Sequence, residues 1–245
     1  KPHPPLWVAC SRRETIHLAA TKGIGALSFS FIEPAEAKSW VDDYYATIAS
    51  EACVPGGFAV NPQVACVIPL MCHNDEATAI ERGLDGGHFF GYSLMHYYVF
   101  GSHQPGVTNI WDDFQANRSK WGFDRDIAAQ TGAPLGAQLM QQGLGSLRGA
   151  VGTPAQIRDL IRGYEEAGVD QLIFVSQCGK NRHEHICESL ELFAAEVMPE
   201  FAERAEAREK EKMERLAPAI EAALARREAA RTADPEYRIQ AQMKV

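Results

Sequence analysis

A run of nine residues without a charged or strongly polar side chain, "VACVIPLMC" over positions 64–72, constrains the fold of this chain most. A strand that faces water on one side alternates apolar and polar residues, and this run does not alternate. It therefore predicts a strand buried on both faces, as in a parallel sheet covered by helices. Pro69 predicts a local irregularity near the end of that strand.

Three other apolar runs, at 6–10, 25–31 and 171–176, also predict buried strands. Segments with apolar residues at helical spacing lie between them, for example at 34–50. Alternating strands and helices indicate an α/β fold with a parallel sheet. A complete (β/α)8 barrel needs eight strands. The sequence supplies about four, so it predicts part of a barrel.

Capping residues predict where two of the helices begin. Asn74 or Asp75 can cap the helix that follows the nine-residue run. Thr153 is the expected cap of a later helix, with Pro154 at its first position. The stretch 145–154 before that helix is rich in glycine and is predicted to be a loop.

Composition bounds the partners and the compartment. The net charge is −8, which argues against nucleic acid or an anionic membrane as the main partner. No apolar run approaches the roughly 20 residues that a membrane-spanning helix needs, and no signal peptide is visible. The six scattered cysteines contain no CxxC pair, which favours free thiols in a reducing cytoplasm. We therefore expect a cytoplasmic protein.

The residues after the first strand, Ser11-Arg12-Arg13-Glu14-Thr15, begin a helix and allow two interpretations. Ser11 is a candidate N-cap, with Glu14 at the spacing of a capping box. Alternatively, the free N–H groups of the helix start bind an anion, helped by the Ser11 hydroxyl and the arginines. The residues alone leave both interpretations open.

Three segments carry a resemblance to a known family. "KPHPPLWVACSRRETIHLAATKGIGAL", "GGHFFGYSLMHYYVFGSHQPGVTNIWDDF" and "VGTPAQIRDLIRGYEEAGVDQLIF" resemble the bacterial luciferase-like flavin-dependent monooxygenases. The resemblance implies a TIM barrel in which the opening strand is about the fifth, so the chain resembles the C-terminal half. Residues 1–198 are then barrel, with an aromatic-rich helical insertion at 86–150, and 199–245 form a charged helical tail.

The resemblance also implies where the cofactor binds. In the family, the helix after this strand points its N-terminus at the flavin phosphate. Relatives often read Ser-Ser-Pro-Glu-Thr here, and Arg12 replaces one of these hydroxyl residues. The loop after the last strand implies a further contact at Gly179. The predicted cofactor-binding residues are Cys10, Ser11, Arg12, Thr15 and Gly179.

The implied activity is oxidation of an organic substrate by reduced FMN and O2. The resemblance further implies a separate reductase that supplies the reduced FMN, and a homo-oligomer. One alternative is a deazaflavin-dependent oxidoreductase of the same superfamily, which transfers hydride without oxygen. Another is a non-catalytic half-barrel that acts only in an assembly, through the exposed edges of its sheet.

His88, Tyr92 and His96 recur every four residues and form one stripe of a helix. This stripe predicts either a wall of the substrate pocket or core packing with satisfied polar tips. Histidine is a natural general base near neutral pH, but nothing in the sequence selects a catalytic residue.

The segment "NRHEHICE" places His183 and Cys187 four residues apart, a spacing that can bind zinc on a helix. It is not HExxH, and no second pair of ligands lies nearby in the sequence. We therefore predict no metal site, and expect the segment to begin the helix after the last strand.

Overall fold

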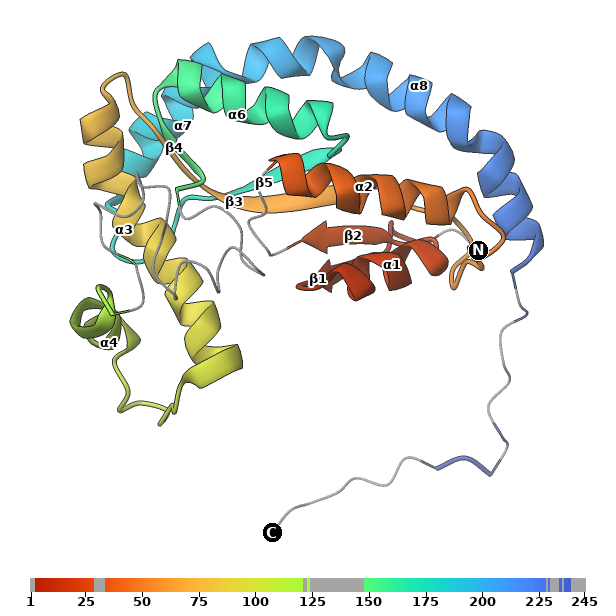
Figure 1. The fold of residues 1–245 in the computed structure, drawn as a ribbon, viewed down its shortest axis with the longest axis horizontal. Helices are drawn as coiled ribbons and strands as arrows, with labels where there is room; N and C mark the ends of the chain where they lie inside the picture. Colours follow the sequence, from red (N-terminus) through yellow and green to blue (C-terminus); the bar gives the residue numbers. More distant parts are fainter. Residues whose placement is uncertain are drawn as a thin grey trace.

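The computed structural model describes residues 3–28, 34–120, 123, 148–227, 229, 234 and 236–238. Within these residues one parallel sheet alternates with helices along the chain (Figure 1). The strands are β1 (Trp7–Cys10), β2 (Gly25–Ser28), β3 (Val64–Cys72), β4 (Ala150–Gly152) and β5 (Gln171–Val175). The helices are α1 (Arg13–Thr21), α2 (Pro34–Ile48), α3 (Glu76–Met95), the π-helical turn η1 (His96–Phe100), α4 (Ile110–Asn117), α6 (Pro154–Glu166), α7 (His183–Glu196) and α8 (Met198–Ala225).

β3 is the strand that connects the sheet. Its first residues pair with β2, with Val64 opposite Ala26, and residues 65–69 pair with β5. Its carboxyl end pairs with β4, with Leu70 opposite Ala150. All nine residues of β3 are buried, which confirms the interpretation of its unbroken apolar sequence.

The main hydrophobic core lies between the sheet and the helices α1, α2 and α6. Alternate side chains of β3, such as Cys66 and Ile68, enter this core together with Tyr44 of α2 and Tyr164 of α6. α8 passes over α6 and α2 as an outer layer (Figure 1). All six cysteines are free, and five of them are buried. Burial raises the pKa of the Cys10 thiol to about 11, so this thiol stays protonated near neutral pH.

Two of the outer strands, β1 and β5, carry exposed apolar side chains. Among the described residues, β1 pairs only with β2, and β5 only with β3. Trp7 of β1 is 37% exposed and Ile173 of β5 is 42% exposed. A parallel sheet is normally covered or closed at such positions. The α/β architecture predicted from the sequence is thus confirmed, and the sheet fits part of a barrel.

One local expectation was wrong. Residues 150–152, predicted as loop, form β4, because they pair with the carboxyl end of β3. A strand of three residues is too short for a sequence period to reveal it. α3 continues through Gly86 and Gly87. These glycines let α3 approach its neighbours, since a Cβ on Gly86 would lie 2.4 Å from the Asn181 side chain, and one on Gly87 3.1 Å from Pro69. In the part of the chain that is described, no helix combines the length and the apolar character that crossing a membrane requires.

Candidate functional site

The carboxyl ends of the parallel strands define the candidate site. The arrowheads of β1 and β2 point toward the side of the molecule where α3 and α4 lie (Figure 1). In open and closed parallel α/β folds, ligands bind at this end of the strands, among the loops that lead into the helices.

α1 begins directly at the end of β1. Its N-cap residue is Arg12, in an extended conformation, and its side chain makes no capping hydrogen bond. The expectation that Ser11 is the N-cap was therefore wrong, because the helix begins one residue later. Ser11 and Arg12 are both exposed. The first turn of α1 thus carries no side-chain cap from its N-cap residue, and a serine and an arginine flank it.

The other residues predicted at this helix start lie in different surroundings. The Cys10 side chain is fully buried, and its thiol donates to the Val8 carbonyl oxygen at 3.3 Å. Cys10 therefore offers the site only its backbone. Thr15, one turn into the helix, is half-buried. The Arg13 side chain points toward α2, where its guanidinium lies 4.0 Å from the Asp43 carboxylate.

The ends of β3 and β4 bring together three polar residues that sequence reasoning missed. The Glu76 carboxylate at the start of α3 accepts hydrogen bonds from Arg148 at 2.6 Å and from Gln156 at 2.9 Å. The hydrogen bond from Arg148 and then that from Gln156 lower the pKa of Glu76. These residues are 72 and 80 positions apart from Glu76, so no local pattern signals their contact.

The predicted caps of both neighbouring helices are confirmed. Asp75 accepts from the Thr78 backbone N–H at 2.7 Å and caps α3. Thr153 and Gln156 form a capping box at the start of α6, with Pro154 at its first position.

The loop after β5 packs tightly against α3 and α4. Gly179 has a φ of +61°, which glycine adopts readily. A Cβ on Gly179 would lie 2.9 Å from the Trp111 ring and 3.1 Å from the Gly86 Cα. The Lys180 ammonium lies 5.1 Å from the centre of the same Trp111 ring. Close packing therefore explains this glycine without a ligand.

Replacing Gly179 by alanine is expected to lower the free energy of unfolding by about 2–3 kcal/mol, because both the φ angle and the contact with Trp111 become unfavourable. Gly56→Ala is the matched control, since a Cβ there meets nothing within 4 Å. Urea denaturation of both variants measures the difference. Equal stability of the two variants would contradict the packing described for this loop.

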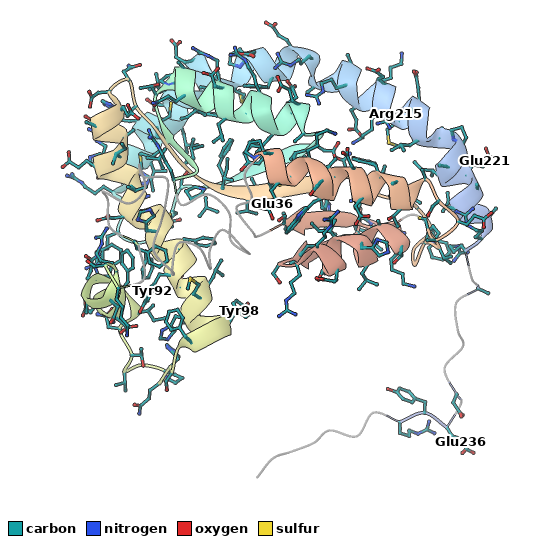
Figure 2. All side chains as sticks on the ribbon, in the orientation of Figure 1. Glu36, Tyr92, Tyr98, Arg215, Glu221 and Glu236 are labelled. Carbon is teal, nitrogen blue, oxygen red and sulfur yellow. The ribbon has the colours of Figure 1, made fainter. Side chains whose placement is uncertain are left out.

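The stripe of His88, Tyr92 and His96 lies in a second hydrophobic cluster. His88 is fully buried, Tyr92 is 1% exposed and His96 is 4% exposed. Figure 2 shows Tyr92 on the side of α3 that faces α4, and Tyr98 at the end of the helical segment. The cluster consists of Tyr92, Met95, Phe114 and Phe123, with Phe89, Phe100, Ile110 and Trp111 packed against it.

Asp113 of α4 is a polar partner of this cluster, and no local sequence pattern indicated it. Tyr92 donates its hydroxyl to the Asp113 carboxylate at 2.5 Å. His96 Nδ1 lies 3.7 Å from the same carboxylate oxygen. The contact between α3 and α4 therefore joins an imidazole, a phenol and a carboxylate.

His183 and Cys187 share one face of α7, as their spacing predicted, with 3.5 Å between His183 Nε2 and Cys187 Sγ. No group of three or more histidine, cysteine, aspartate or glutamate side chains arranged for a metal ion is found among the described residues.

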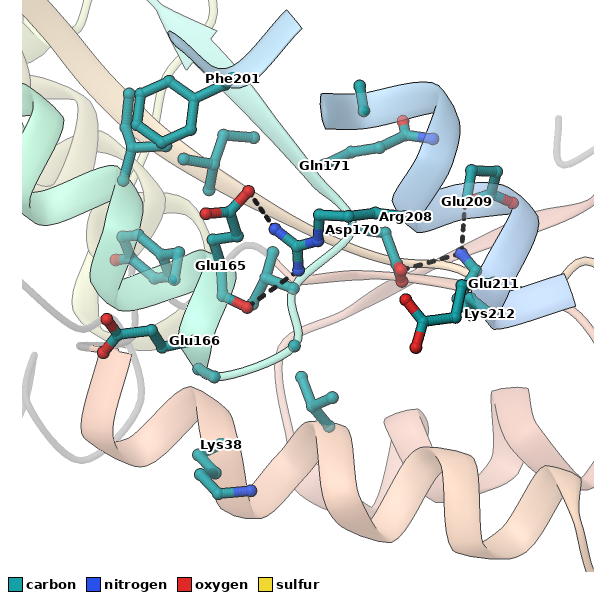
Figure 3. Close-up of a pocket in the computed structure, with 18 of the residues that line it drawn as sticks. Lys38, Glu165, Glu166, Asp170, Gln171, Phe201, Arg208, Glu209, Glu211 and Lys212 are labelled. Carbon is teal, nitrogen blue, oxygen red and sulfur yellow. Dashed lines mark hydrogen bonds and ion pairs between the residues drawn. The ribbon is translucent and has the colours of Figure 1, made fainter. Parts of the chain in front are cut away.

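One pocket in the described part of the chain lies away from the strand ends just described. It has a volume of about 680 Å³ and lies between α2, α6, α8 and the start of β5 (Figure 3). Several of its charged residues pair with one another: Arg208 with Glu165, and Lys212 with Asp170 and Glu209. This pocket lies at the amino end of β5, so we do not assign the cofactor to it.

Comparison with known families identifies the class of the protein. The family described as luciferase-like monooxygenase matches residues 1–171. The chain belongs to this family, as the sequence motifs predicted. A comparison with curated proteins found no match.

Three solved structures are similar to part of this chain. Apo-MsnO8 is 21% identical with a TM-score of 0.45, and the match covers 78% of this chain and 52% of that one. The coenzyme F420-dependent tetrahydromethanopterin reductase from Methanopyrus kandleri is 18% identical with a TM-score of 0.47, covering 80% and 51%. The monooxygenase RslO1 from Streptomyces bottropensis is 19% identical with a TM-score of 0.47, covering 82% and 49%. The chain thus spans about half the length of the structures that it matches.

Proposed function

We propose that this chain is part of a flavin-dependent monooxygenase, and that the start of α1 binds the phosphate of reduced FMN. The observation that carries the proposal is the first turn of α1, which opens at the carboxyl end of β1 without a side-chain cap on its N-cap residue. Free N–H groups and the positive end of the helix dipole favour an anion there. Membership of the luciferase-like monooxygenase family supports a flavin-type cofactor.

Three side chains would hold the phosphate together with the backbone N–H groups. Ser11 and Thr15 supply hydroxyl donors, and Arg12 supplies a charge-assisted donor. Ser11 and Arg12 are exposed and thus accessible to a ligand. Bound reduced FMN would supply the electrons for activating O2, and the protein would orient the cofactor and the organic substrate and exclude water.

The stripe on α3 is the proposed wall of the substrate pocket. Tyr92 of α3 and His96 of η1 are 1% and 4% exposed, so the wall would consist of the packed ring cluster to which they belong. His88 belongs to the same stripe. A separate reductase would deliver the reduced FMN, and the exposed edges of β1 and β5 favour association of the chain with a further copy or domain.

Replacing both Ser11 and Thr15 by alanine is expected to weaken FMN binding about a hundredfold, since two hydroxyl donors to a charged group are lost. Equilibrium titration with FMN, followed by flavin fluorescence, measures the effect. Thr21→Ala, at the other end of α1, is the matched control and should bind FMN as the unmodified protein does.

A parallel titration with coenzyme F420 tests the alternative cofactor. If F420 binds more tightly than FMN and turnover needs no O2, the protein is a deazaflavin-dependent oxidoreductase and the proposed monooxygenase function is wrong. Unchanged FMN affinity in the double variant would refute the assignment of the phosphate site.

A further inference from the structure

His96 is a buried imidazole whose polar atoms make no hydrogen bond. Its side chain is 4% exposed, and neither ring nitrogen finds a hydrogen-bond partner within the described residues. A buried polar group without a partner costs about 1–3 kcal/mol. The neutral imidazole therefore stabilises this part of the chain through packing and not through hydrogen bonds.

His96 also opens an unusual piece of backbone. The turn η1 is π-helical and is closed by the Gly101 N–H, which donates to the His96 carbonyl oxygen at 2.8 Å. Such π-helical turns are rare and are found frequently at functional sites. A Cβ on Gly101 would lie 2.5 Å from the His96 ring, so the loop after η1 lies directly on the imidazole.

An acidic partner is fixed next to this imidazole. Asp113 Oδ2 lies 3.7 Å from His96 Nδ1, and the Asp113 carboxylate accepts from Tyr92 at 2.5 Å and from Asn117 at 3.0 Å. Burial, and then the hydrogen bond to Asp113, raise the pKa of the Tyr92 hydroxyl. Tyr92 therefore keeps its proton and its donation to Asp113, and the carboxylate stays oriented toward His96.

The titratable groups that face His96 come from every described element around it. They are Tyr92 of α3, with its ring centre 6.5 Å away, Tyr97 of η1 at 5.5 Å, His103 of the following loop at 6.0 Å, and Asp113 of α4. Among these neighbours Asp113 is the one carboxylate. A proton on His96 therefore creates an attraction to α4, while a proton on His103 creates a repulsion.

We propose that His96 and Asp113 form a proton-operated clamp between η1 and α4. When His96 is neutral, its ring only packs against its neighbours. Protonation adds an ion pair with Asp113 across the contact between the two elements. The clamp is therefore closed when His96 carries a proton, and it weakens when His96 loses that proton.

The clamp determines how firmly two aromatic side chains are held. Tyr97 is 57% exposed and Tyr98 is 83% exposed, and both lie on η1. Fixing η1 on α4 therefore fixes the aromatic surface that this turn presents to solvent. The inference stands on the contacts of His96 and does not depend on the proposed cofactor or reaction.

The Gly101 amide reports directly on the clamp, because its hydrogen bond closes η1. Its hydrogen exchange is measured by NMR from about pH 8 to about pH 5.5, with each rate divided by that of an unstructured peptide at the same pH. We expect protection to rise about tenfold toward the lower pH. Protection that does not change with pH would overturn the proposal.

Four variants identify the groups responsible. Asp113→Asn keeps the shape and an acceptor for Tyr92 but removes the charge, and it should abolish the pH dependence, as should His96→Phe. Asp112→Asn, the neighbouring acid on α4 whose carboxylate accepts from Asn109, should keep it. His103→Gln should keep it as well. Persistence of the pH dependence in Asp113→Asn, or its loss in His103→Gln, would contradict the clamp.

Discussion

Replacing Asp170 by alanine is expected to lower the free energy of unfolding by about 3–5 kcal/mol. The Asp170 carboxylate accepts hydrogen bonds from the Tyr45 hydroxyl at 2.6 Å, from the Val64 backbone N–H at 2.6 Å and from the Lys212 ammonium at 2.8 Å. It therefore connects α2, the start of β3 and α8. The Lys212 side chain is only 9% exposed, so alanine at position 170 leaves a buried cation whose one remaining carboxylate partner among the described residues is Glu209.

Two comparison variants separate this network from ordinary ion pairs. Asp159→Ala removes a carboxylate that is 73% exposed and pairs with Arg162 on the same helix, and it should cost less than about 1 kcal/mol. Lys212→Met leaves Asp170 with its two other donors and should cost less than Asp170→Ala. Urea denaturation of the three variants measures these differences. A loss from Asp170→Ala no larger than that from Asp159→Ala would show that Asp170 does not join the three elements.

The features that the sequence predicted correctly depend on neighbouring residues. The unbroken apolar run 64–72 predicted β3, and Thr153 with Pro154 predicted the start of α6. In both cases the physical cause acts within one strand or one helical turn. The apolar runs at 6–10, 25–31 and 171–176 likewise predicted β1, β2 and β5.

The features that the sequence did not predict depend on contacts between distant segments. β4 has three residues and exists because β3 lies beside it. Asp113 becomes a partner of the stripe on α3 only after α4 folds back onto that helix. Asp170 and Lys212 are 42 residues apart. No periodicity or short motif records such pairs.

The start of α1 shows a third kind of limit. The spacing of Ser11 and Glu14 predicted a capping box, and the helix instead begins after Arg12 without a side-chain cap. A shift by one residue lies within the usual uncertainty of helix ends. Here that shift frees the Ser11 hydroxyl from capping, which is what the proposed phosphate site requires.

FMN is expected to bind about a hundredfold more tightly than riboflavin, which is FMN without its phosphate. The phosphate would accept hydrogen bonds from the first turn of α1 and from Ser11, and it would lie near the Arg12 guanidinium. Hydrogen bonds to a charged group contribute about 1.5–3 kcal/mol each, so two of them account for a hundredfold difference in affinity. Added salt should reduce this preference, because it screens the exposed charges.

Isothermal titration of the protein with FMN and with riboflavin, at one salt concentration, tests the cofactor assignment most directly. We predict about hundredfold tighter binding of FMN, and a preference that shrinks when Ser11 and Thr15 are both replaced by alanine. Equal affinities for FMN and riboflavin would contradict a phosphate site at the start of α1.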